Sequence, residues 1–141
     1  MTSLPAKILD RIASWPEAAQ VRLLEIRTIF LDIAAETGPL SETLKWGEPS
    51  WLPAKPRRGT TLRVSWFPET AQEIGIFVHC QTTLSGTMQE IYPDTFRYSG
   101  NRGLHNDLNQ DLPKEAVAHL AQLAFTYHLK RVNVVSKGDS R

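Results

Sequence analysis

The feature of this sequence that most constrains its fold is a change in the spacing of apolar residues near Gly38 and Pro39. Before this point, apolar residues recur every three or four positions, which places them on one side of a helix. They are Ala19, Leu23, Ile26, Phe30 and Ile33. After it, apolar and polar residues alternate, as they do along strands with one buried face. The chain therefore predicts an α+β fold.

Local signals predict where the helices begin and end. Ser14 and Glu17 have the spacing of a capping box, which places the start of the long helix there. Asp111 is a plausible cap for the last helix, with Pro113 in its first turn. We expect four helices, over residues 4–13, 15–37, 83–92 and 113–130.

Alternation predicts the strands. Leu62, Val64 and Trp66 share one face of a strand, and the apolar face of the next one runs from Ile74 to Cys80, which places the Cys80 thiol in the core. Together with further segments, the expected strands cover residues 42–46, 62–66, 74–80, 96–99 and 104–108. We expect a two-layer sandwich, with helices packed on one face of a mostly antiparallel sheet of about five strands.

Composition limits the class of protein. The 141 residues carry 16 Lys and Arg against 15 Asp and Glu, so no strong field of one sign favours nucleic acid or an anionic membrane. The single cysteine, Cys80, points to a reducing compartment, and no apolar run is long enough for a membrane span. We expect a cytoplasmic protein with one domain over residues 1–135 and a disordered tail at 136–141.

The segment from Glu42 to Trp51 contains a strand that ends in Trp-Gly-x-Pro before an aromatic residue. This pattern resembles the hallmark of the bacterial YdhG-like family, a domain of unknown function. Shorter matches follow in order over residues 59–63, 77–84, 96–102 and 123–128. The resemblance implies a frataxin-like two-layer fold, and some members of the family are described as intracellular iron chaperones.

An iron chaperone needs carboxylate oxygens gathered on an exposed surface, because iron prefers hard oxygen ligands. Glu25, Asp32 and Glu36 lie near one face of the long predicted helix and are the candidate iron ligands. Arg22 and Ile29 interrupt this row, so a solvated helix face is the competing interpretation.

The sheet itself offers a second candidate site. Period two places His79 on the same strand face as Phe77 and Gln81, away from Cys80, and a neighbouring strand could bring Arg63 beside it. The predicted ligand-binding residues, from several strands, are Lys45, Trp46, Trp51, Arg63, His79, Arg97 and Tyr98. The alternative interpretation is a sheet face that is covered by helices or left in water. The site also depends on strand register, because a slip of one residue would turn these side chains to the other face.

The residues leave three functions open. The first is a binding domain that holds a small molecule or a protein partner on its sheet face, and the second is an iron carrier. The third is an enzyme with His79 as general base, which requires an enclosed cavity around the imidazole ring. Four tryptophans also make an exposed aromatic patch and a homodimer reasonable to test.

Overall fold

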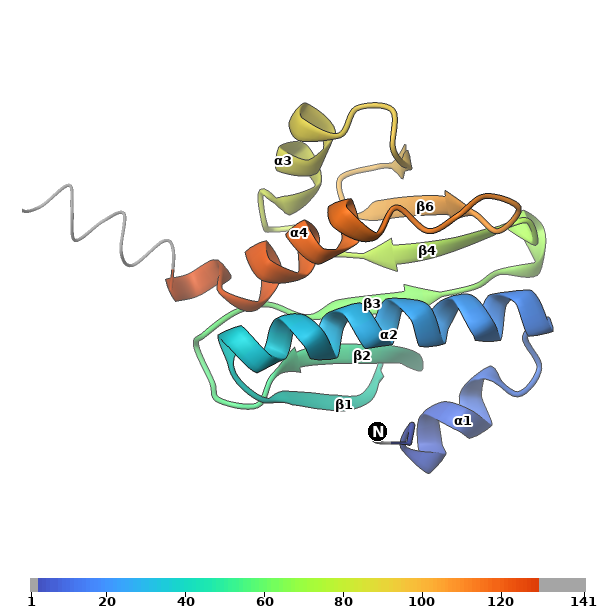
Figure 1. Ribbon diagram of the computed structural model, residues 1–141, viewed down its shortest axis with the longest axis horizontal. Coiled ribbons are helices and arrows are strands. Elements are labelled where there is room, and N and C mark those ends of the chain that lie inside the picture. Colours follow the sequence, from blue (N-terminus) through green and yellow to red (C-terminus); the bar gives the residue numbers. More distant parts are fainter. Residues whose placement is uncertain (1–2, 130–141) are drawn as a thin grey trace, which may run out of the picture.

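The computed structural model describes residues 3–129 (Figure 1). Its helices are α1 (Ala6–Ile12), α2 (Glu17–Thr37), α3 (Leu84–Ile91) and α4 (Lys114–Phe125), with one 3-10 turn, η1 (Pro68–Thr70). Its strands are β1 (Leu40–Lys45), β2 (Glu48–Pro53), β3 (Leu62–Ser65), β4 (Glu73–Phe77), β5 (Arg97–Ser99) and β6 (Gly103–Asp107).

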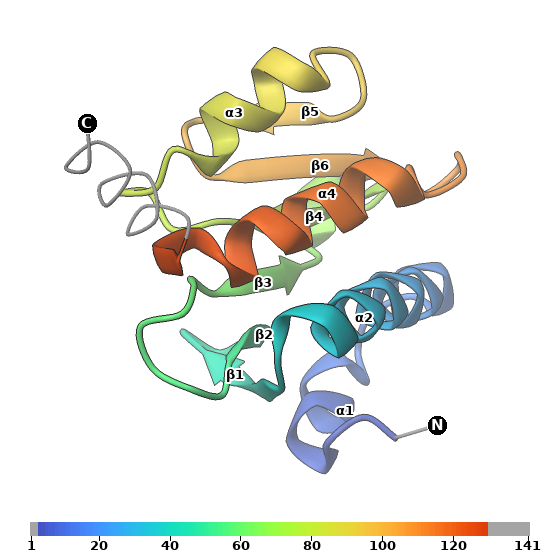
Figure 2. The same ribbon diagram turned by 60° about the vertical axis from the view of Figure 1, so that its left-hand side comes forward.

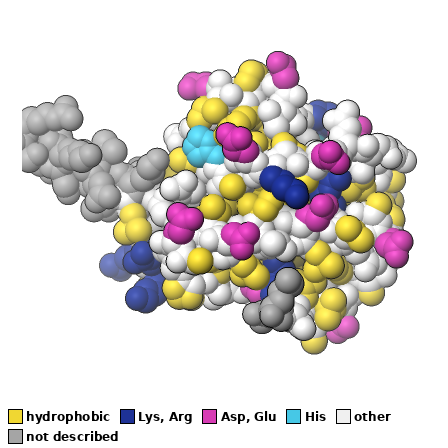
Figure 3. All heavy atoms as spheres, viewed as in Figure 1, with side chains coloured by type: hydrophobic (Ala, Val, Ile, Leu, Met, Phe, Trp, Pro, Cys, Tyr) yellow, Lys and Arg dark blue, Asp and Glu magenta, His cyan; other side chains and the backbone are white. Residues whose placement is uncertain are grey.

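The strands form one sheet in the order β1-β2-β3-β4-β6-β5, and every neighbouring pair is antiparallel. Helices α2 and α4 lie side by side over one face of this sheet, while α1 lies beside β1 and α3 beside β5 (Figures 1 and 2). The predicted α+β sandwich with helices on one side is therefore confirmed. On the helix side, acidic and basic side chains are interspersed with apolar ones (Figure 3).

The core lies between the sheet and helices α2 and α4. Alternate residues of the central strands point into it, as period two predicts, and Val64 and Ile76 are almost completely buried. Phe30 of α2 stands at its centre, with its ring centroid 5.5 Å from Trp51 and 5.7 Å from Phe125, both edge to face.

The sheet has one strand more than the five expected, because Glu48–Pro53, a segment outside the predicted strands, forms β2. Trp46 and Gly47, with φ angles of 56° and 76°, make the whole connection between β1 and β2. A two-residue hairpin of this kind needs positive φ at both positions. Pro49 is tolerated because the β2–β3 ladder begins only at Ser50, so the missing N–H lies outside it.

Two helix ends also differ from expectation. Pro16, and not Ser14, is the N-cap of α2, and its carbonyl accepts the first helical hydrogen bonds. Helix α4 ends at Phe125, where the chain segment before β3 approaches it and the Thr60 N–H donates to Ala124 O at 2.8 Å. The predicted tail at 136–141 lies outside the described residues. Between residues 3 and 129, no helix is long and apolar enough to cross a membrane.

Candidate functional site

The sheet face opposite α2 and α4 carries two rows of cross-strand neighbours. Thr43, Ser50, Arg63, Phe77 and Gly103 form the first row. The second row contains Lys45 and Glu48 at one end and Gly75, His105 and Arg97 at the other. This register brings Arg63 beside Phe77 on the face that the helices leave open, which the sequence alone did not establish.

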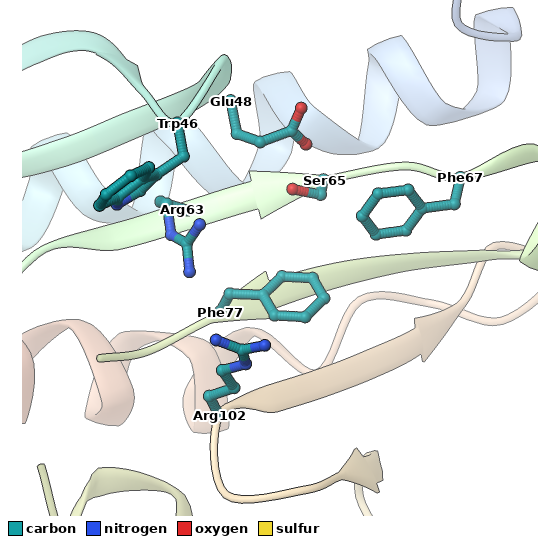
Figure 4. Close-up of a pocket in the computed structure, with 7 residues that line it drawn as sticks. All are labelled: Trp46, Glu48, Arg63, Ser65, Phe67, Phe77 and Arg102. Atoms are coloured by element: carbon teal, nitrogen blue, oxygen red, sulfur yellow. The ribbon is translucent and has the colours of Figure 1, made fainter. Parts of the chain in front are cut away.

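The β1–β2 hairpin turn places Trp46 at the margin of this open face. Its side chain is 89% exposed, the most exposed large apolar group among the described residues. The tight turn leaves little backbone around the indole to bury it, so the ring projects over the sheet beside Arg63 (Figure 4).

Beside Trp46 the open face is hollowed. One hollow of about 320 Å³ is lined by Trp46, Glu48, Arg63, Ser65, Phe67, Phe77 and Arg102 (Figure 4). A second, of about 260 Å³, is lined by Lys45, Trp46, Thr61, Arg63 and His79. The two hollows share Trp46 and Arg63, so they adjoin each other across these side chains.

Glu48 brings to the first hollow a buried side-chain oxygen without a donor in the described part of the chain. It is 9% exposed, and its Oε1 accepts a hydrogen bond from Arg11 Nη2 at 2.5 Å, while Arg11 Nε donates to Gly47 O at 2.6 Å. Its Oε2 is buried and accepts no hydrogen bond from any described residue. A buried acceptor without a donor costs on the order of 1–3 kcal/mol, so the folded protein carries a polar atom that a ligand can satisfy.

The cations around the hollows are also uncommitted. Within residues 3–129, the side chains of Arg63 and Arg102 make no hydrogen bond or ion pair, and the same holds for the Lys45 side chain. In Figure 4 the guanidinium groups of Arg63 and Arg102 lie on either side of the Phe77 ring. Two planar donors beside aromatic surface suit a carboxylate or phosphate on an apolar body.

The far end of the open face contains a closed polar network. Arg97 donates to both carboxylate oxygens of Glu73, and this hydrogen bonding holds the pKa of Glu73 below its usual range and raises that of Arg97. Burial lowers the pKa of His105, the Arg97 charge lowers it further, and the Glu73 charge opposes both. His105 Nε2 lies 2.8 Å from Ser99 Oγ.

Ser99, His105 and Glu73 contact one another in the order of a Ser-His-acid catalytic triad, but they lack the hydrogen bond between the histidine and the acid. His105 Nδ1 is 4.0 Å from the nearer Glu73 oxygen, too far for a hydrogen bond, and Arg97 already occupies that carboxylate. The His105 ring also packs edge to face against Phe77, at 5.5 Å. The network therefore stabilises the sheet face next to the hollow.

Four of the seven predicted ligand-binding residues come together, because Lys45, Trp46, Arg63 and His79 line the second hollow. The other three, Trp51, Arg97 and Tyr98, lie elsewhere. Arg97 is on the open face but is paired with Glu73.

Trp51 and Tyr98, two of the predicted ligand-binding residues, do not line either hollow. Trp51 has no exposed surface and donates from Nε1 to Glu42 on the helix side of the sheet. The Tyr98 hydroxyl donates to Met88 O and Tyr92 O at α3, and burial raises the pKa of Tyr98. The uncounted strand β2 explains the error at Trp51, because the hairpin pairs it with Glu42.

His79 and Cys80 lie beyond the end of their strand. Strand β4 stops at Phe77, so the expected alternation does not continue, and the Cys80 thiol is exposed and not in the core. His79 is exposed as well, and its Nδ1 accepts a hydrogen bond from the Gln81 backbone N–H at 3.1 Å. An exposed ring lacks the enclosed cavity that a general base would need here.

The predicted iron ligands do not converge. Glu25 accepts a hydrogen bond from Arg22 Nε at 2.9 Å, and Asp32 and Glu36 are exposed farther along α2. Among the described residues, no three His, Cys, Asp or Glu side chains form a group that could hold a metal ion.

Sequence reasoning missed several residues that line the first hollow. Glu48 follows the hairpin turn directly, Arg102 lies in the turn between β5 and β6, and Phe67 comes after β3. The only signal for Glu48 was Gly47, which suits the second position of a two-residue hairpin, whereas such turns favour Asn, Asp or Gly and not Trp at the first position.

Comparison of the chain with protein-family models, curated proteins and solved structures gave no match. Membership of the YdhG-like family therefore stays a prediction.

Proposed function

We propose that this chain is a cytoplasmic ligand-binding domain of the YdhG-like family, which holds a small anionic ligand on the open face of its sheet. The observation that carries the proposal is the pair of uncommitted guanidinium groups, Arg63 and Arg102, beside the exposed ring of Trp46 in one hollow. A half-buried and an exposed guanidinium group, both without a protein partner among the described residues and both beside apolar rings, favour a ligand that offers an acid and an apolar surface.

The shape of the site favours a small molecule over a protein partner. The uncommitted groups line two adjoining hollows of about 320 and 260 Å³ and do not form a flat apolar patch. The single cysteine, with its free thiol, supports the cytoplasmic location, and the Trp-Gly-Glu-Pro segment supports the family.

The experiment is a titration of ¹⁵N-labelled protein with 4-methylbenzoate and, separately, inorganic phosphate, followed by nuclear magnetic resonance. We expect saturable shifts of the Trp46 indole and of backbone amides in β3 and β4. The variant Arg63→Gln/Arg102→Gln should bind the better probe at least about tenfold more weakly, the effect of losing one or two charge-assisted hydrogen bonds.

The matched control is Lys55→Gln/Arg57→Gln, which removes two charges from the exposed loop between β2 and β3. It should bind as the natural chain does. Equal losses in the two double variants would mean that net charge, and not the site, determines binding. Shifts confined to residues away from the open face would refute the proposal.

A further inference from the structure

The free oxygen of Glu48 indicates a second charged group on the ligand. This inference rests on the proposed function. We infer that the ligand is a zwitterion, with a protonated amine that donates to Glu48 Oε2 and an acidic group that accepts from Arg63 and Arg102. An apolar body, one ring or its equivalent, joins the two and lies over Phe77.

The amine end follows from the chemistry of Glu48. A carboxylate oxygen accepts hydrogen bonds and offers no proton, so only a donor satisfies it. Arg11 already donates to Oε1, which leaves Oε2 as the carboxylate oxygen without a donor among the described residues. That position suits one N–H of an ammonium group and not the paired donors of a guanidinium or a nucleobase edge, which need both oxygens.

The acid end follows from where the cations lie. Glu48 comes from β2, Arg63 from β3, Phe77 from β4, and Arg102 from the turn that leads into β6. Neighbouring strands are about 4.8 Å apart, so the amine and acid positions are separated by one to three strand spacings. Figure 4 shows the Phe77 ring between Glu48 and the Arg102 guanidinium. A single ring bearing the two groups at opposite ends fits this span.

Access to Oε2 depends on the rim of the hollow. Because this oxygen has almost no exposed surface, an ammonium group reaches it only when a neighbouring side chain changes rotamer. Trp46 and Phe67 line the hollow. The Trp46 ring is exposed and can move at little packing cost, whereas Phe67 would give up its edge-to-face contact with Phe77. Binding of the amine should therefore be accompanied by a change in the environment of at least one of these rings.

The test uses three probes that share one ring: 4-(aminomethyl)benzoate, 4-methylbenzoate and 4-methylbenzylamine. Their affinities for the full chain are measured by the same resonance titration. We expect the zwitterion to bind at least about tenfold more tightly than either singly charged analogue, the ratio that one charge-assisted hydrogen bond gives. Glu48→Gln should remove this preference, because its amide replaces the acceptor with a donor, while 4-methylbenzoate binding persists.

The control is Glu90→Gln, an exposed glutamate on α3, which should keep the preference. Thermal unfolding of Glu48→Gln checks its fold, and Phe77→Ala, which removes the expected ring contact, gives a second variant that should weaken the zwitterion. If 4-methylbenzoate binds the natural chain as tightly as the zwitterion, the inference is wrong and the anion-binding function stands. If no probe binds below about 10 mM, the proposed function fails as well.

Discussion

Replacing Glu42 tests the reasoning about how the hairpin that carries Trp46 and Glu48 is attached to the helices. Arg27 of α2 donates to both oxygens of Glu42, from Nε at 2.6 Å and from Nη2 at 2.8 Å. Trp51 Nε1 donates to the same carboxylate at 3.1 Å. One side chain therefore joins β1, β2 and α2, and the exposed fractions of the Arg27 and Glu42 side chains are only 6% and 14%.

The magnitude follows from what each substitution leaves behind. Glu42→Ala removes the carboxylate from a buried guanidinium and from the indole N–H, so the free energy of unfolding should fall by about 3–5 kcal/mol. Glu42→Gln keeps one carbonyl acceptor but loses the charge, and should cost roughly 1–2 kcal/mol. Glu36→Ala, an exposed change on α2, should stay within about 0.5 kcal/mol of the natural chain.

The assay is urea unfolding followed by far-ultraviolet circular dichroism. Burial raises the pKa of Glu42, but the hydrogen bonds from Arg27 and Trp51 and the Arg27 charge outweigh it, so the pKa lies below its usual value of 4.5. A depressed pKa stabilises the fold above the unfolded value and loses this effect as pH falls through the folded one. The difference between the natural chain and Glu42→Gln should therefore shrink below about pH 4.5. A loss under about 1 kcal/mol for Glu42→Ala, or a difference independent of pH, would refute this account.

Three further outcomes follow from individual positions. A Cβ on Gly59 would lie 2.4 Å from a backbone oxygen of α4, so Gly59→Ala should cost at least about 1–3 kcal/mol in chemical denaturation, whereas Gly86→Ala, in open space within α3, should stabilise by about 0.5–1 kcal/mol. The exposed Cys80 thiol should react with Ellman's reagent in the folded state, and protection until unfolding would contradict its placement. In an anaerobic ferrous titration by calorimetry, the α2 carboxylates Glu25, Asp32 and Glu36 should contribute no saturable binding. Iron binding that is lost when all three are replaced by amides would show that they do bind iron.

Prediction from the sequence succeeded for elements whose apolar spacing recurs over many residues. The period of α2 and the alternation in β3 and β4 each rest on several apolar positions, so one exception does not hide them. It failed at ends and short links, where one or two residues decide. Pro49 favoured a turn, yet the turn is made by Trp46 and Gly47, and this difference of two residues hid a whole strand.

The candidate site was only half predictable for the same reason. Period two predicts only which residues of its own strand share a face with His79. Whether Arg63 of the neighbouring strand lies on that face depends on register, which needs both strands of each pair. When β2 is included in the sheet, its register places Glu48 on the open face and Trp51 in the core. The sequence does not predict that Glu48 Oε2 is free, because this depends on which donors lie near it in three dimensions.

The position of Trp46 also means that intrinsic tryptophan fluorescence should report on binding. Trp15 and Trp51 are buried, and Trp66 is partly covered, with its indole N–H donating to Ala71 O. Trp46 is the indole most open to water, so it should contribute the red edge of the emission spectrum and most of the quenching by iodide. A molecule that settles in the hollow beneath this ring would shield it from the quencher, so occupancy could be followed without any label.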